Sequence, residues 1–396
     1  MRTFSIFFLG FTLLAVSALA EEAPPIWMKE GPNLTNRLAS FEIPIKVVAT
    51  KLYVEVEVGG KPRRFVVDTG SPSMIDTKLS KELGLKVVGN NRGIDAHGVV
   101  IESEIVQASF RIGDVDFQKV PMITADFSAF EITKSFIGDG VLGSELFPLG
   151  VWQFDLQNAV LRFNTDLKKL SHVSNAMKLK LYQYGYPYMP IFDVKFAKRA
   201  HSKAMFDTGS PTFFAISSAD LAGTRKADGI GRTISGYGSP GGSLGGQAPD
   251  AEQLQVELKT LSIGNLKLGR VSAVRRELSP SLIGARLLEH FVVTLDSRSG
   301  DAYFKKYFNG PFARPSFGFT LGFNNSISIA VVWKKSPAEA TGLRPGMELT
   351  SINGVEIEFT SEGIRRAIAA MAGQEIDLAW KDGSAKLTRK THILLE

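Results

Sequence analysis

The sequence predicts a mainly β protein in which one unit is duplicated and is followed by a smaller α+β unit. The run Asp-Thr-Gly-Ser-Pro starts at Asp68 and again at Asp207, each time after three apolar residues. Two apolar residues and a Gly recur 75 residues after the first Asp, at Gly143, and 77 residues after the second, at Gly284. Such spacing indicates duplication of a whole unit of about 140 residues, which predicts two lobes related by a pseudo-twofold axis.

Within each copy the apolar residues form short, often alternating runs, for example at residues 53–58, 105–112 and 254–263. Gly, Asn and Asp separate these runs, as in Gly59-Gly60 and Gly264-Asn265. This pattern is typical of β-strands joined by turns. Residues 80–84 and 217–223 begin with Ser and end with Gly, which predicts one short helix in each copy.

The amino terminus has the layout of a cleaved secretory signal. Arg2 precedes an apolar run at residues 6–16, and small residues follow up to Ala20. The run is shorter than the roughly 18 residues that a membrane-spanning helix needs, which argues against a permanent anchor. We therefore expect cleavage near Ala20, an exported protein that is periplasmic or secreted, and no integral membrane segment after cleavage.

Composition removes several classes of function. The chain has no Cys and only five His, none spaced i,i+4, so thiol catalysis is excluded and a metal centre gains no support. No metal site or cofactor is expected. The net charge of +6 is too small and too dispersed to indicate a nucleic-acid partner. Residues 166–310 hold most of the basic excess, with 20 Lys and Arg against 12 Asp and Glu.

Two carboxylates on matched turns predict an acid–base site. Each Asp follows an apolar strand and precedes a Gly that lets another backbone come close. A single copy would also suit a plain turn, but two matched copies favour a functional pair. If a pseudo-twofold axis brings Asp68 and Asp207 together, the two side chains share a proton. One carboxylate then activates a water while its protonated partner polarises a carbonyl.

Residues 41–307 resemble the aspartic peptidase superfamily, with both retropepsin-like or pepsin-like lobes in one chain. The resemblance rests on the two Asp-Thr-Gly-Ser loops and the two apolar-apolar-Gly elements. It implies that Asp68 and Asp207 are catalytic and that polypeptides are the substrates. It also assigns supporting roles to other residues: the Thr residues brace the loops, the Ser residues orient carboxylate oxygens, and the Gly residues of the two apolar-apolar-Gly elements pack behind the loops. These supporting residues are Thr69, Gly70, Ser71, Thr208, Gly209, Ser210, Gly143 and Gly284.

The same resemblance implies β-hairpin flaps over the cleft. Residues 93–99 contain Gly98, and residues 236–242 contain Tyr237 and Gly238, at matched distances from the two Asp residues. Matched distances favour two flaps, as in retroviral enzymes, over the single flap of pepsins. The Gly-rich stretch 229–249 is expected to be either a mobile lid or a disordered insertion. His97 is expected to be a loop residue outside the catalytic set.

Residues 315–396 resemble a PDZ domain. The resemblance rests on Phe317-Gly318-Phe319, the run from Ser336 to Gly346, and the sequence Ile352-Asn353-Gly354. It implies that Phe317, Gly318 and Phe319 bind the C-terminus of a peptide or protein, which adds as a strand beside a helix at residues 361–371. The alternative is a PDZ fold that only packs against the lobes.

Together these patterns predict an exported aspartic-type endopeptidase with a PDZ domain for peptide recruitment or regulation. The expected boundaries are 1–20 for the signal peptide, 21–40 for an irregular lead-in, 41–165 and 166–310 for the two lobes, and 315–396 for the PDZ domain. The alternative from another class is a non-catalytic peptide-binding protein that keeps the cleft. Intact Asp-Thr-Gly-Ser in both copies favours catalysis.

Overall fold

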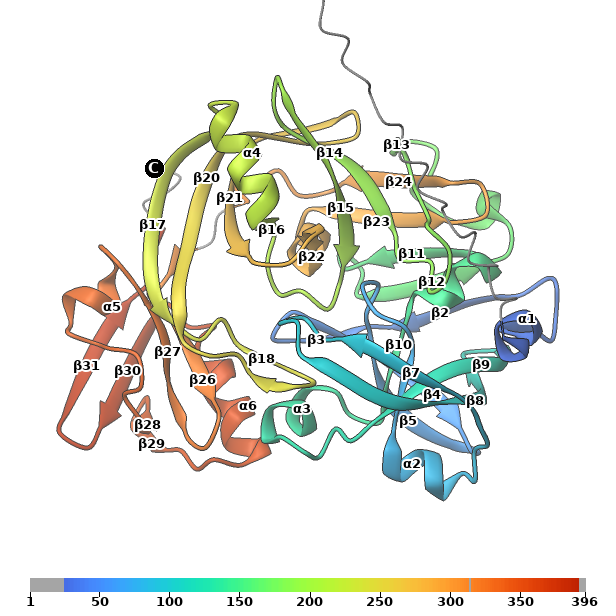
Figure 1. Ribbon diagram of the computed structural model, residues 1–396, viewed down its shortest axis with the longest axis horizontal. Coiled ribbons are helices and arrows are strands. Elements are labelled where there is room, and N and C mark those ends of the chain that lie inside the picture. The colour runs from blue at the N-terminus through green and yellow to red at the C-terminus, as the bar shows by residue number, and fades with distance from the viewer. Residues whose placement is uncertain (1–24, 313–314, 392–396) are drawn as a thin grey trace, which may run out of the picture.

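The computed structural model describes residues 25–312 and 315–391 (Figure 1). The predicted signal peptide, residues 1–20, lies outside the described residues. The described chain is mainly β, as predicted, and its strands form several sheets. No helix within the described ranges is long and apolar enough to cross a bilayer.

The first lobe is built on a nine-stranded sheet. Its order is β1-β9-β6-β10-β5-β4-β8-β7, and β3 also pairs with β4. The strands are β1 (Asn33–Leu34), β3 (Lys46–Val48), β4 (Lys51–Val58), β5 (Lys61–Val67), β6 (Met74–Asp76), β7 (Val87–Ile94), β8 (Val100–Ile112), β9 (Val115–Ala125) and β10 (Gly140–Leu142).

The second lobe repeats this arrangement. Its strands are β14 (Ile191–Ala197), β15 (Ala200–Asp207), β16 (Phe214–Ser217), β17 (Ile230–Gly238), β20 (Ala251–Ile263), β21 (Leu266–Arg276) and β22 (Ser281–Gly284). The order β14-β15-β22-β16-β21 corresponds to β4-β5-β10-β6-β9 of the first lobe. The register is also repeated, since Val66 lies opposite Val141 and Met205 lies opposite Leu282.

A six-stranded sheet joins the lobes. Its order is β13-β24-β23-β11-β12-β2, with β2 (Ser40–Pro44), β11 (Val151–Asp155), β12 (Val160–Asn164), β13 (Met177–Lys180), β23 (Phe291–Asp296) and β24 (Asp301–Lys306). The central pair is β11 of one lobe and β23 of the other, where the Gln153 amide donates to Thr294 Oγ1 at 2.8 Å. Because one hydrophobic core runs through both lobes, the lobes behave as one folded unit.

The predicted helices form near their expected positions but begin at different residues. Helix α2 (Thr77–Glu82) starts before Ser80 because the Asp76 carboxylate accepts the backbone N–H groups of Lys78 and Leu79. Helix α4 (Ser218–Lys226) is capped by Ser217, which occupies the equivalent position in the second lobe. Short 3₁₀ turns follow β10, β12 and β22 at Ser144–Leu149, Leu167–Lys169 and Ala285–Glu289.

The lead-in is more ordered than predicted. Helix α1 (Ile26–Glu30) and strand β1 precede the first lobe, and β1 pairs with β9. Burial of an aromatic ring accounts for part of this order, since the Trp27 ring packs edge-on against Tyr186 with centroids 5.5 Å apart.

The C-terminal unit carries its own core of Phe, Ile and Leu side chains. Its elements are β25 (Pro315–Ser316), β26 (Phe319–Phe323), β27 (Ile327–Trp333), α5 (Pro337–Ala340), β28 (Leu349–Ile352), β29 (Val355–Glu356), α6 (Ser361–Ala370), β30 (Glu375–Trp380), β31 (Gly383–Thr388) and β32 (Lys390–Thr391).

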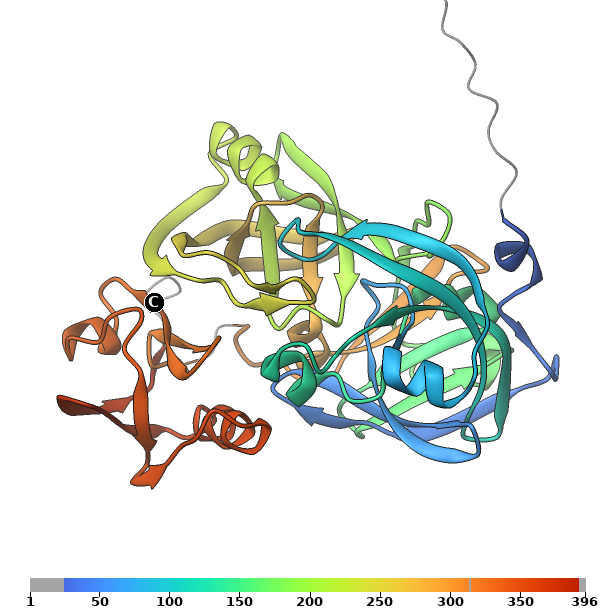
Figure 2. The same ribbon diagram turned by 60° about the horizontal axis from the view of Figure 1, so that its bottom comes forward.

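This unit touches both lobes. Strand β27 pairs with β17, so that β27 and β26 extend the sheet of the second lobe. Helix α6 packs against α3 (Glu131–Phe136) of the first lobe, where the Ser361 hydroxyl donates to Glu131 at 3.1 Å. Figures 1 and 2 show the unit beside the two lobes, attached along β17 and near α3.

Candidate active site

The two Asp-Thr-Gly turns lie at equivalent strand ends. Asp68 follows β5 and its N–H donates to the carbonyl of Leu142 at 3.0 Å, while Asp207 ends β15 opposite Gly284. Both strands behind the turns are parallel to the strand that carries the Asp. The duplicated apolar-apolar-Gly elements therefore lie behind the turns, in the position that the resemblance to aspartic peptidases implies.

Gly143 and Gly284 are required by close packing at this place. A Cβ on Gly143 would lie 2.2 Å from the carbonyl carbon of Pro72, and a Cβ on Gly284 would lie 2.1 Å from the carbonyl oxygen of Thr212. Backbone atoms cannot move away cheaply, so any larger residue would displace the turn. This close packing fixes the position of both Asp-Thr-Gly loops relative to the strands behind them.

Two buried threonines cross-link the loops. The N–H of Thr69 donates to Thr208 Oγ1 at 3.1 Å, and the N–H of Thr208 donates to Thr69 Oγ1 at 3.0 Å. Each hydroxyl then donates to a carbonyl of the opposite lobe, Thr69 to Phe206 at 2.5 Å and Thr208 to Val67 at 2.7 Å. Both side chains are fully buried, so the four bonds form a rigid link between the lobes.

The carboxylates of Asp68 and Asp207 face each other across this link. A Cβ on Gly209 would lie 2.3 Å from Asp68 Oδ2, and a Cβ on Gly70 would lie 2.5 Å from Asp207 Cγ. Each glycine thus leaves room for the carboxylate of the opposite loop. Backbone N–H groups fix the orientation, because Gly70 donates to Asp68 Oδ1 at 2.9 Å and Ser210 donates to Asp207 Oδ1 at 3.1 Å.

The electrostatic surroundings favour a shared proton. Burial raises the pKa of Asp207 well above its usual range, and the negative charge of Asp68 raises it further. The positive charge of Lys51 acts in the opposite direction. Two like charges in one low-dielectric site cannot both form easily, so the pair retains one proton into the neutral range.

Lys51 is a member of the site that the sequence analysis missed. It begins β4, directly after a turn at Ala49 and Thr50 whose φ angles are both positive. Its Nζ donates to the carbonyl oxygen of Gly209, so a first-lobe cation touches the loop of the second lobe. A Lys that starts a strand has no distinctive sequence signal, and its partner is 158 residues away.

Behind the first loop lies the buried carboxyl group of Glu145, which was also not predicted as a site residue from the sequence. The Glu145 side chain is fully buried and accepts the N–H of Ser73 at 2.9 Å. The Ser73 hydroxyl in turn accepts the N–H of Gly143 at 2.8 Å. Burial raises the pKa of Glu145 to about 7, against the lowering effect of its hydrogen bonds to Ser73. Glu145 follows the apolar-apolar-Gly element by two residues, and this position is the sequence signal that could have identified it.

Ser71 and Ser210 are predicted to orient the carboxylates, but the contacts of their hydroxyl groups do not show this role. Ser210 Oγ is within 3.0 Å of Thr212 Oγ1. Ser71 Oγ is buried and, among the described residues, has no hydrogen-bond partner. Their orienting role therefore stays a prediction.

The first predicted flap is the β7–β8 hairpin. The Asp95 carboxylate closes its tip by accepting the N–H groups of His97 and Val99 at 2.9 and 2.8 Å. The same carboxylate accepts the Ser243 hydroxyl and, at 3.0 Å, the N–H of Gly245 from the second lobe. Gly98 lies against Leu278, because a Cβ at Gly98 would be 3.9 Å from that side chain. The flap tip therefore contacts the second lobe.

The second predicted flap is the β17–β20 hairpin, but its edge is covered. Tyr237 pairs with Val332 and Gly238 pairs with Val331 of β27. The Gly-rich stretch that follows forms a small hairpin of β18 (Gly242–Ser243) and β19 (Gly246–Gln247). A role for Tyr237 and Gly238 in binding substrate stays a prediction.

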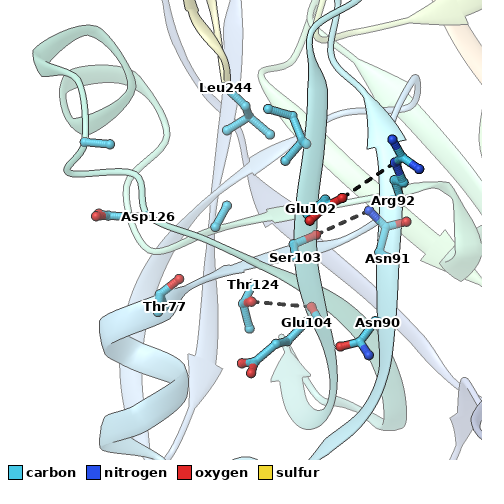
Figure 3. A pocket seen from close by; sticks show the side chains of 13 residues that line it. Thr77, Asn90, Asn91, Arg92, Glu102, Ser103, Glu104, Thr124, Asp126 and Leu244 are labelled. Atoms are coloured by element: carbon cyan, nitrogen blue, oxygen red, sulfur yellow. Dashed lines mark hydrogen bonds and ion pairs between the residues drawn. The ribbon is translucent and has the colours of Figure 1, made fainter.

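A cavity of about 760 Å³ lies beside the strands of the first flap (Figure 3). Polar side chains from β7, β8 and the end of β9 line it together with Leu244. Arg92 pairs with Glu102 at 3.6 Å across its wall. None of the predicted catalytic or supporting residues lines this cavity, so it is separate from the Asp pair.

The loop predicted to bind a peptide terminus lies at the start of β26. Phe317 and Phe319 are buried, and Gly318 has a φ of +82° and donates its N–H to Ser316 Oγ at 2.9 Å. Strand β26 is the last strand of its sheet, so among the residues that the structure describes one of its edges has no strand partner. Within the described ranges, no three His, Asp or Glu side chains cluster as metal ligands would.

A comparison with protein families agrees with the geometry of the first lobe. Residues 54–146 match the family model described as Aspartyl protease. This part of the chain is similar to an aspartyl protease domain. The matched stretch contains Asp68 and Gly143, while Asp207 lies outside it. A search of curated proteins returned no match.

Proposed function

We propose that the protein is an aspartic-type endopeptidase whose catalytic pair is Asp68 and Asp207. The observation that carries the proposal is the pair of cross-linked Asp-Thr-Gly loops, which face their carboxylates across the joint between the lobes. The aspartyl protease match supports the first half of this pair.

The chemistry follows from the different surroundings of the two carboxyl groups. Asp207, with its raised pKa, is the protonated member and donates a hydrogen bond to the peptide carbonyl. Asp68 accepts a proton from a water that attacks the carbonyl carbon, and the Asp207 proton moves to the carbonyl oxygen. When the tetrahedral intermediate collapses, the C–N bond breaks, the nitrogen of the leaving amine takes the proton from Asp68, and a hydroxyl of the intermediate gives its proton to Asp207, so the pair returns to its starting state.

A cleavage assay distinguishes the proposed peptidase from the alternative, a non-catalytic protein that binds extended peptides. The mature protein is incubated with an unfolded polypeptide between pH 3 and 8, and mass spectrometry identifies the cut sites. We expect internal cuts by the wild type and none by Asp68→Asn or Asp207→Asn. Binding without cleavage at every pH would support the alternative.

We also propose that residues 315–396 are a PDZ domain that recruits or regulates substrate. The support is the edge of β26 that has no strand partner among the described residues, the core that β26 shares with α6, and the resemblance of Phe317-Gly318-Phe319 to a terminus-binding loop. Export to the periplasm or the medium, after cleavage near Ala20, is part of the same proposal and rests on the sequence of residues 1–20.

A binding measurement tests the PDZ proposal. Peptides that end in a free carboxylate and the same peptides ending in an amide are titrated against the full mature chain. Binding of the free acid that Gly318→Val abolishes would support it, because a Cβ at Gly318 would lie 2.0 Å from Ser336 Cβ and must displace the loop. Equal binding of acid and amide would oppose it.

A further inference from the structure

Arg276 stands on the second-lobe wall, near the Asp pair and the first flap. It is the last residue of β21 and lies opposite Ser217 of β16. The residues that follow include Leu278, which contacts Gly98 at the flap tip. The equivalent register position in the first lobe, opposite Asp76, is Ala125. The duplication therefore placed a long cation on one wall only.

This cation is partly buried without a carboxylate at ion-pair distance among the described residues. Its guanidinium donates to the carbonyl oxygen of Pro280, which fixes its direction. Burial lowers the pKa of Arg276, while the negative charge of Asp207 acts against that effect from farther away. A desolvated guanidinium held only by a neutral carbonyl retains donors for an anion.

The neighbouring charges are already engaged. Arg275 pairs with Glu277 at 3.0 Å, and the Ser218 hydroxyl donates to the same carboxylate at 2.9 Å. On the flap, His97 is the titratable group that senses the charge of Arg276. Glu277 is thus engaged by its neighbours, whereas the charge of Arg276 acts on both His97 of the flap and Asp207.

We propose that Arg276 is a specificity-determining residue that binds a carboxylate of the substrate. The chemical class is an anionic peptide group near the cut bond, either an Asp or Glu side chain or a free C-terminus. A guanidinium binds a carboxylate through two parallel hydrogen bonds, and partial burial strengthens them. The basic excess of residues 166–310 acts in the same direction by attracting acidic peptides. This inference rests on the proposed peptidase activity.

The test uses matched peptides that carry Glu or Gln at each position around one cut site. We expect the wild type to prefer one Glu peptide by roughly 10- to 100-fold in kcat/KM, as a charged hydrogen bond provides. Arg276→Gln should remove this preference while cleavage of the Gln peptide continues, and Arg276→Lys should restore part of it. Arg275→Gln is the matched control and should keep the preference.

Further comparisons identify the source of the carboxylate and the results that would contradict the inference. Amidation of the peptide C-terminus lowers kcat/KM in the wild type, and not in Arg276→Gln, if the bound group is the terminus; it leaves kcat/KM unchanged if the bound group is the Glu side chain. Absence of both a Glu preference and an amidation effect in the wild type, or persistence of the observed effect in Arg276→Gln, would overturn the inference. So would an equal loss for Glu and Gln peptides with a shifted pH profile, because Arg276 would then act on Asp207.

A binding assay distinguishes failure of this inference from failure of the peptidase proposal. Binding of the Glu and Gln peptides to the Asp68→Asn variant, with and without Arg276→Gln, is measured by fluorescence anisotropy and needs no catalysis. A Glu preference that depends on Arg276 in this assay, without cleavage by the wild type, would sustain the carboxylate site and reject the peptidase. Equal binding of the Glu, Gln and C-terminally amidated peptides would reject the site.

Discussion

At the scale of residues, the two aspartates differ in their surroundings although their loops are copies. Asp207 is the one whose pKa is raised by burial and by Asp68, and Lys51 moderates the effect. The pair needs one proton to act. Activity should therefore be present below the raised pKa and should fall as the pH increases through it.

Lys51→Met tests this electrostatic balance. Loss of the positive charge raises the pKa of Asp207 further, so the protonated form persists to higher pH. The alkaline limb of the kcat/KM profile should move upward by about half to one pH unit. Lys51→Arg keeps the charge and should leave the limb near its original place. A downward shift in Lys51→Met would contradict the assigned sign.

Glu145 gives a prediction on stability. Its pKa is about 7 in the folded protein and near 4.5 when unfolded, so the folded state binds more protons between these values. Stability is then full below about pH 4.5 and is lost as the pH rises towards 7, by about 3 kcal/mol in total. Denaturant titrations from pH 4 to 8 should show a slope that Glu145→Gln flattens. The exposed substitution Glu57→Gln should leave the slope unchanged.

The threonine cross-link gives a second stability prediction. Thr208→Val removes the hydroxyl that accepts the Thr69 N–H and donates to Val67, and both groups remain buried. We expect a loss of about 2–4 kcal/mol in the free energy of unfolding, measured in urea. Thr208→Ser, which keeps the hydroxyl, should lose much less. Equal stability of the Val variant and the wild type would show that the cross-link does not hold the lobes.

At the scale of elements, the pairing of β17 with β27 connects the second flap to the C-terminal unit. Gly238 lies opposite Val331 with a φ of +132°, and a Cβ there would lie 1.7 Å from the carbonyl oxygen of Ala330. The two strands can approach only because this residue has no side chain. A peptide that adds to β26 would extend the same sheet.

Gly238→Ala should open this pairing. Hydrogen exchange at Val331 and Val332 should accelerate, and cleavage of an unfolded polypeptide should change more than cleavage of a short peptide. Gly241→Ala is the matched control, since its φ of +131° imposes the same backbone strain but no atom lies within 4 Å of the added Cβ. Faster exchange in both variants would attribute the effect to strain and not to the strand contact.

The sequence predicted the features that repeat. The two Asp-Thr-Gly loops, the elements behind them and the short helices could be predicted because identical residues recur at matched spacing. Lys51 and Arg276 could not, since each acts through residues distant in sequence and neither has a counterpart in the other lobe. The β17–β27 pairing depends on how two finished units meet, which strand patterns alone do not specify.

At the scale of the whole molecule, the proposed site lies at the joint between the lobes. The six-stranded sheet and the common core fix the lobes, and the threonine link sets the distance between the carboxylates. The C-terminal unit then contacts both lobes through β17 and α3. The central claim is that Asp68 and Asp207 act as one catalytic unit.

The most direct test is kcat/KM for one polypeptide with the wild type, Asp68→Asn, Asp207→Asn and the double variant. One shared site predicts that each single variant loses roughly a thousandfold or more and that the double variant loses no more than either, because residues that act as a unit are not additive. A single variant that cleaves like the wild type, or losses that multiply in the double variant, would contradict the account.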